Sequence, residues 1–182
     1  VHLTNGFKPL LAFLLVPFAS VHAALIIGAV ADGITSWSLA RLAHRLSKSD
    51  VAAVAAATIG SLSPSAIATS MNGLETSLGI ACLTGALLAF ETKKPWLGLL
   101  LGLSLLARVD SVFFVAAMGV VLLRRDGLVP TLRHAGLAAI VVAPWWIYSI
   151  AHFETFVPES GAAVREQAMM YRDAGMVVRD QI

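Results

Sequence analysis

The feature that most restricts the fold of this chain is a series of long apolar stretches divided by short clusters of basic residues. A helix needs about 20 predominantly apolar residues to cross a bilayer, and stretches such as Ala135 to Ala151 approach that length. Only 13% of the 182 residues are charged, against roughly a quarter in soluble domains. The sequence therefore predicts an all-α fold: a polytopic transmembrane helix bundle with short and re-entrant helices.

The basic residues indicate which side of the membrane each connection faces. Three loops, 41–50, 91–95 and 124–134, carry most of the positive charge. By the positive-inside rule these loops face the cytoplasm, which predicts a multi-pass protein of the cell's inner or plasma membrane. Eight of the 13 Lys and Arg residues form these clusters: Arg41, Arg45, Lys48, Lys93, Lys94, Arg124, Arg125 and Arg133.

The stretch from Trp96 to Leu123 starts and ends among basic residues, so it is expected to leave the cytoplasmic side and return. Its turn falls at Arg108-Val109-Asp110, which gives two arms of about 12 residues. Each arm then reaches only about 18 Å, well short of the ~30 Å hydrocarbon core. The turn is therefore predicted at membrane depth; the alternative is one long helix of about 28 residues with an ion pair at its centre.

The remaining segments complete the predicted topology. Pro9 to Phe18 is too short to cross, which indicates an interfacial or re-entrant piece, and Val21 to Leu39 is a span interrupted by Asp32-Gly33. Leu74 to Phe90 is a returning helix, and Ala135 to Ala151 is a span that tolerates Pro144.

Two regions follow from this topology. Residues 1–152 form a partial transmembrane domain with five to six membrane visits. Residues 153–182 begin an extracytoplasmic loop with a short amphipathic helix. Because the chain starts at Val1 and lacks a signal-peptide pattern, we expect both ends to be cut from a longer protein.

Four polar clusters fall on the same, non-cytoplasmic side of this topology. A charge at membrane depth costs a few kcal/mol or more unless it is paired or hydrated, so Arg108, Asp110 and Glu75 are expected to line a wet cavity. Simpler interpretations stay open: Arg108 and Asp110 pair only to pin the hairpin, Glu75 is an acid in a first helical turn, and Lys8 snorkels to the interface. The candidate site residues are Asn5, Lys8, Asn72, Glu75, Arg108, Asp110 and Ser160.

Other function classes find little support in the composition. The net charge of +2 and the lack of aromatic residues interleaved with basic ones argue against nucleic-acid binding. One cysteine, Cys82, cannot form a disulfide framework or a cysteine-based metal site. The five histidines show no ligand spacing, so none is assigned to a metal.

Four short motifs carry a resemblance to a known family. They are Thr4-Asn5-Gly6-Phe7-Lys8-Pro9-Leu10, Asn72-Gly73-Leu74-Glu75-Thr76, Leu105-Leu106-Ala107-Arg108-Val109-Asp110 and Phe156-Val157-Pro158-Glu159-Ser160-Gly161. In order and spacing they resemble the GT-C class of integral-membrane glycosyltransferases, in the bacterial branch similar to protein mannosyltransferases and lipid A sugar transferases. The chain departs from the pattern at Lys8, where the family usually has His, and at Leu11, where it usually has Trp.

The resemblance implies a GT-C-like fold and an inverting transfer of a sugar from a polyprenyl-phosphate donor to a glycan, lipid or protein acceptor at the extracytoplasmic face. Its catalytic aspartate lies in a first outer loop, expected upstream of Val1 together with an N-terminal span. Arg108 and Lys8 would face the leaving phosphate. Glu75 and Asp110 would position Arg108, an acceptor hydroxyl or a divalent metal ion, the one cofactor that the resemblance admits.

Two readings from other classes compete with the transferase. A transporter or flippase would bind its solute at a discontinuous hairpin near the midplane, but the sequence shows none of the internal repeats expected for it. A non-catalytic membrane scaffold would use the same charges only for structure. An aspartate in an outer loop upstream of Val1 would favour the transferase over both.

Overall fold

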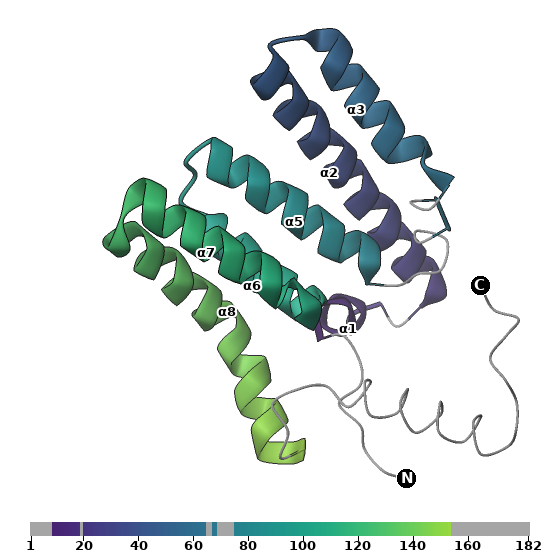
Figure 1. Cartoon of the computed structure of the whole chain (residues 1–182). Helices are drawn as coiled ribbons and strands as arrows, with labels where there is room; N and C mark the ends of the chain where they lie inside the picture. The colour runs from purple at the N-terminus through teal and green to yellow at the C-terminus, as the bar shows by residue number, and fades with distance from the viewer. Residues whose placement is uncertain (1–8, 19, 65–66, 69–74, 154–182) are drawn as a thin grey trace, which may run out of the picture. The chain divides into compact units, whose positions relative to one another are not determined.

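The computed structural model describes residues 9–18, 20–64, 67–68 and 75–153. All regular structure in these residues is helical, which confirms the predicted all-α class for this part of the chain (Figure 1). The elements are α1 (Pro9–Leu15), α2 (Val21–Ser47), α3 (Asp50–Leu62), α5 (Thr76–Glu91), α6 (Leu97–Ala107), the short 3-10 helix η1 (Val109–Ser111), α7 (Val112–Asp126) and α8 (Leu128–Phe153).

Two helices are long and apolar enough to cross a membrane, α2 and the Leu128–His152 part of α8. The predicted interruption at Asp32-Gly33 is wrong, because α2 runs without a break for 27 residues. Ser20 caps its start by accepting a hydrogen bond from the Ala23 amide at 3.1 Å. Each of its two interior glycines, Gly28 and Gly33, costs about 1 kcal/mol of helix propensity, which a helix of this length tolerates.

The chain divides into two compact units, and the boundary falls inside α8 after Pro144. Lys8–Pro144 forms the larger unit, which contains nearly all of the described helices. In the smaller unit the described residues are the end of α8, where the rings of Tyr148 and His152 stack with centroids 4.2 Å apart. The predicted boundary at residue 152 cannot be compared with this division, because residues 154–182 lie outside the described residues.

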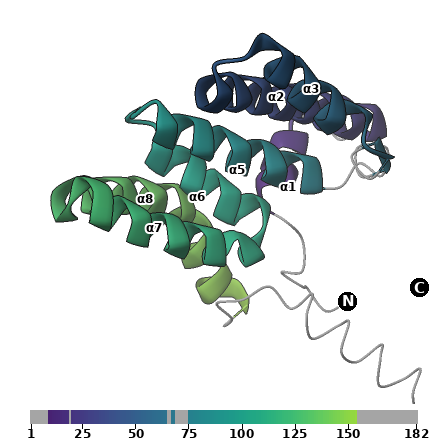
Figure 2. The same ribbon diagram turned by 45° about the horizontal axis from the view of Figure 1, so that its top comes forward.

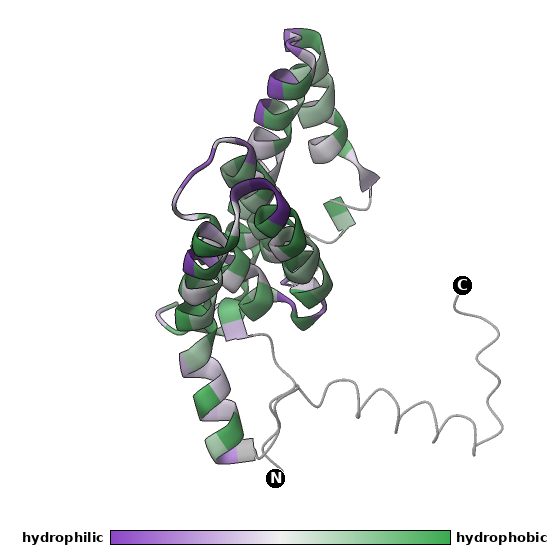
Figure 3. Cartoon of the chain, turned by 60° about the vertical axis from the view of Figure 1, so that its left-hand side comes forward, coloured by the Kyte–Doolittle hydropathy of each residue, from purple (hydrophilic) through white to green (hydrophobic). Residues whose placement is uncertain are grey.

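Within the larger unit the helices run alternately up and down. Helix α5 packs against both α2 and α6, and α7 runs back toward the α5–α6 turn (Figures 1 and 2). The α2–α3, α5–α6 and α7–α8 connections therefore lie at one end of this unit. The starts of α5 and α7 lie at the other end. Hydrophilic colour gathers mainly at turns and helix ends, while the helix bodies are mostly hydrophobic (Figure 3).

Two of the three connections at this end, which we call the basic end because it carries the basic clusters, are shorter than predicted. Loop 91–95 is confirmed as a turn between α5 and α6, but the loop boundaries 41–50 and 124–134 are wrong. Arg41 and Arg45 belong to α2, and the link between α7 and α8 is Gly127 alone. Arg45 in α2 and Arg124 and Arg125 in α7 lie in the last turn of their helices, where basic side chains are favourable. Gly127 has φ 87°, a left-handed conformation that suits glycine.

Two glycines allow α6 to lie close against α8 within the larger unit. A Cβ atom added at Gly98 would lie 2.4 Å from the carbonyl oxygen of His134, and one at Gly102 would lie 2.7 Å from Cβ of Val141. Small residues four positions apart are a common means of close helix packing in membranes. The buried core beside this contact joins α5, α6, α7 and α8 and consists of Ala86, Ala89, Phe90, Leu97, Leu101, Met118, Leu122 and Ala138.

Candidate functional site

The break between α6 and α7 carries the candidate site. Helix α6 ends at Ala107, and Arg108 takes an extended conformation with φ −149° and ψ 122°. The Ser111 hydroxyl closes the turn, donating to the carbonyl oxygens of Ser104 (2.7 Å) and Arg108. This break confirms the predicted turn at 108–110.

The far end of α7 shows that the chain returns. Arg125 donates from Nη2 to the carbonyl oxygen of Phe90 at 3.0 Å, and its guanidinium carbon lies 3.6 Å from the centroid of the Phe90 ring. Phe90 belongs to the last turn of α5, directly before the turn that leads into α6. The hairpin formed by α6 and α7 therefore begins and ends at the same end of the larger unit. The alternative of one 28-residue helix is wrong.

Arg108 is held by two elements. Its Nε and Nη2 donate to the two carboxylate oxygens of Asp110 at 3.0 and 2.8 Å, and its Nη1 donates to Oγ1 of Thr76 at 3.2 Å. Its aliphatic stem crosses Gly79, where a Cβ atom would lie 3.0 Å from Cδ of Arg108. Asp110 thus fixes the plane of the guanidinium, and the first turn of α5 fixes its position.

Negative charge lies beside this guanidinium. Asp110 is in direct contact with it, and Glu75 adds a further favourable charge. The side chains of Arg108 and Asp110 are 36% and 62% exposed. The pair is therefore open at the surface of the described structure, where a ligand can reach it.

The structure brings together part of the predicted site. Arg108 and Asp110 bind each other, and Glu75 lies directly before α5 without a side-chain capping bond. The simpler interpretation predicted that Arg108 and Asp110 pair across the turn, and this pairing is observed. It accounts for three of the five guanidinium N–H groups once Thr76 is included. The predicted residues Asn5, Lys8, Asn72 and Ser160 lie outside the described residues.

Sequence reasoning missed Thr76 and Gly79. Thr76 stands next to Glu75 in a motif already singled out, and Gly79 lies three residues later, on the same face of a helix. This spacing was the available signal. The sequence does not show which residue this face of α5 contacts. Only the packing of α5 against α6 shows that it meets Arg108.

A divalent metal ion does not fit the described residues. Both carboxylate oxygens of Asp110 already accept hydrogen bonds from Arg108. Among the residues that the structure describes, no group of three or more His, Cys, Asp and Glu side chains could hold a metal.

The fold and site define a helical protein with two helices able to cross a membrane and a paired arginine at a helix break. Comparisons with protein families, with curated proteins and with solved structures found no match to this chain.

Proposed function

We propose that this chain belongs to a membrane glycosyltransferase of the GT-C type, which moves a sugar from a polyprenyl-phosphate donor to an acceptor at the extracytoplasmic face. The observation that carries the proposal is the Arg108 guanidinium, oriented by Asp110 and Thr76 at the α6–α7 break. The four motifs that resemble the GT-C class add support, because the structure joins two of them through the Thr76–Arg108 bond.

The proposed reaction needs a cation beside the leaving phosphate. As the acceptor oxygen attacks the anomeric carbon, the bond from that carbon to the phosphate oxygen breaks, and negative charge develops on the lipid phosphate. An oriented guanidinium stabilises such charge because it presents fixed N–H donors. Two N–H groups of Arg108 have no acceptor among the described residues. In this proposal they bind the leaving phosphate.

The site would lie at membrane depth, open to the extracytoplasmic side. Helix α6 has 11 residues, about 16 Å at 1.5 Å per residue, so it is too short to carry Arg108 across a ~30 Å hydrocarbon core. The basic clusters at the opposite end support a cytoplasmic position for that end. An aspartate in an outer loop upstream of Val1, as the resemblance implies, would deprotonate the acceptor.

Transfer assays with the full-length protein test this role. Membranes containing the wild type, Arg108→Ala, Arg108→Lys or Arg124→Ala would receive a radiolabelled polyprenyl-phosphate sugar, and transfer of label would be measured. Loss of one donor at a developing oxyanion costs about 10²–10³ in rate, so Arg108→Ala should lose at least 100-fold. Arg108→Lys keeps the charge without the planar fork and should fall between Arg108→Ala and wild type.

Arg124 is the matched control, because it lies at the other end of α7 and is exposed. Arg124→Ala should transfer sugar at the wild-type rate. Wild-type turnover of Arg108→Ala, with unchanged affinity for the donor, would remove Arg108 from the site. A protein that passes the labelled lipid across the bilayer without transferring its sugar would instead be a flippase.

A further inference from the structure

We propose that the basic end of the larger unit holds a second site, which binds the phosphate headgroup of an anionic phospholipid. The site lies between the α5–α6 turn and the start of α8, at the end of the helices opposite Arg108. It requires membrane insertion with this end facing lipid headgroups, and it does not depend on sugar transfer.

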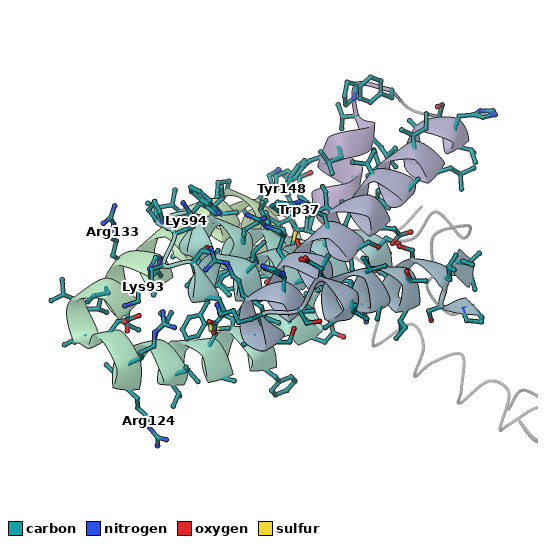
Figure 4. All side chains as sticks on the ribbon, turned by 90° about the horizontal axis from the view of Figure 1, so that it is seen from above. Trp37, Lys93, Lys94, Arg124, Arg133 and Tyr148 are labelled. Carbon is teal, nitrogen blue, oxygen red and sulfur yellow. The ribbon has the colours of Figure 1, made fainter. Side chains whose placement is uncertain are left out.

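Two adjoining hollows form this site, which we call the basic cleft. One, of about 490 Å³, is bordered by Lys93, Lys94, Arg125 and His134. The other, of about 260 Å³, is bordered by Lys93, Lys94, Arg133 and His134. Figure 4 shows Lys93, Lys94 and Arg133 at the same end of the helices, whereas Arg124 points away. Four cations from three elements therefore border these two hollows, and one carboxylate, that of Asp126, borders the larger one.

Lys93 lies at a backbone position that favours glycine. Its φ is 52°, in the left-handed region. The Lys93 amide donates to the carbonyl oxygen of Phe90 at 3.2 Å, and the Lys94 amide donates to that of Ala89 at 2.8 Å. This pair of bonds is the helix ending that usually places glycine at the left-handed position. A lysine there costs backbone energy, so glycine can replace it without harm to this turn.

The other polar groups of the cleft leave room for an anion. The carboxylate of Asp126 is paired with Arg125 at 3.2 Å, so its charge is balanced within the protein. Arg125 is itself fixed on the ring and carbonyl of Phe90. His134 Nδ1 is buried and has no hydrogen-bond partner among the described residues.

The surroundings favour a lipid over a free phosphate. Trp96 is 49% exposed beside the cleft, with Nζ of Lys94 5.2 Å from its ring centroid, an arrangement typical of the membrane interface. Val129, which borders the cleft, is 79% exposed. Basic pockets between transmembrane helices on the cytoplasmic side bind anionic headgroups. The acyl chains would then lie along the exposed apolar side chains.

Native mass spectrometry of the detergent-solubilised full chain tests the site. The protein would be mixed with equal amounts of phosphatidylglycerol and phosphatidylcholine, and the retained lipids would be counted. We expect phosphatidylglycerol to be retained in preference. Each basic residue near an anionic surface contributes about fivefold in binding, so the double variant Lys93→Gly, Arg133→Gln should reduce the preference by more than fivefold.

The matched control is Lys48→Gly, Arg124→Gln. Lys48 also has a left-handed backbone, with φ 56°, and Arg124 lies at the same end of the unit, outside both hollows. This variant removes the same charge, and glycine suits both left-handed positions, so both variants should fold. The control should keep the lipid preference. Equal loss in both variants would show attraction by overall charge and overturn the site.

Thermal unfolding with added ligand distinguishes binding of a lipid from binding of a free anion. Phosphatidylglycerol should raise the unfolding temperature of the wild type and not that of the cleft variant, while glycerol phosphate and inorganic phosphate at the same concentration should raise neither. Equal stabilisation by inorganic phosphate would overturn the assignment to a lipid. Unchanged lipid preference in the cleft variant would overturn the cleft itself.

Discussion

At the scale of single residues, the Arg108–Asp110 pair is better suited to function than to stability. Both side chains are more than one-third exposed, and exposed ion pairs contribute about 0–1 kcal/mol to folding. The pair nevertheless has bidentate geometry, which fixes a guanidinium in one plane. Its main effect is therefore to orient Arg108.

Asp110→Asn is expected to lower the free energy of unfolding by less than about 1 kcal/mol and to reduce sugar transfer much more strongly, because Arg108 loses its orientation. Unfolding in mixed detergent and the transfer assay would be compared for the same preparation. Asp126→Asn, at the other end of α7, should leave transfer unchanged. A loss of several kcal/mol in Asp110→Asn with normal transfer would make the pair purely structural.

The two left-handed lysines give a second prediction at this scale. Lys93→Gly and Lys48→Gly should be as stable as wild type or up to about 1 kcal/mol more stable, because glycine adopts positive φ without the Cβ clash. Thermal unfolding in detergent measures this. If either variant were clearly less stable, the lysine side chain would be contributing more to the fold than its backbone position costs.

At the scale of elements, the close contact of α6 with α8 depends on glycine. Gly98→Ala places a Cβ atom 2.4 Å from the carbonyl oxygen of His134, so one helix must shift. Such overpacking costs about 1–3 kcal/mol. Gly136 in α8 has nothing within 4 Å of the same added atom, and Gly136→Ala should be neutral or stabilising by up to about 1 kcal/mol. Unfolding titrations of the two variants should differ in this direction; equal stabilities would contradict the packing of α6 on α8.

The sequence predicted the helices better than their ends. The hairpin from Trp96 to Leu123 followed from basic residues at both of its ends and from the polar turn between them, and the structure has it. The interruption at Asp32-Gly33 and the long loops at 41–50 and 124–134 were wrong. The length of α2 is set by its Ser20 cap and by the left-handed backbone of Lys48. The distribution of charged residues predicts neither feature.

At the scale of the whole molecule, the sequence could indicate which residues share a side, and it could not supply the register between helices. That Arg108 and Glu75 lie near each other followed from predicted sidedness. The roles of Thr76 and Gly79 required the packing of α5 against the α6–α7 break. The basic cleft likewise depends on how α8 starts beside the α5–α6 turn, which no local pattern encodes.

The proposed function requires a hairpin whose two basic ends share one side of the membrane while its turn opens to the other. Single cysteines at Lys93, Arg124 and Val109, in a Cys82→Ala background, would be labelled in intact cells with a membrane-impermeant maleimide. We predict that position 109 reacts from outside, and that positions 93 and 124 react only after the membrane is opened. Labelling of 93 and 124 from opposite sides, or protection of 109 from both sides, would contradict the account.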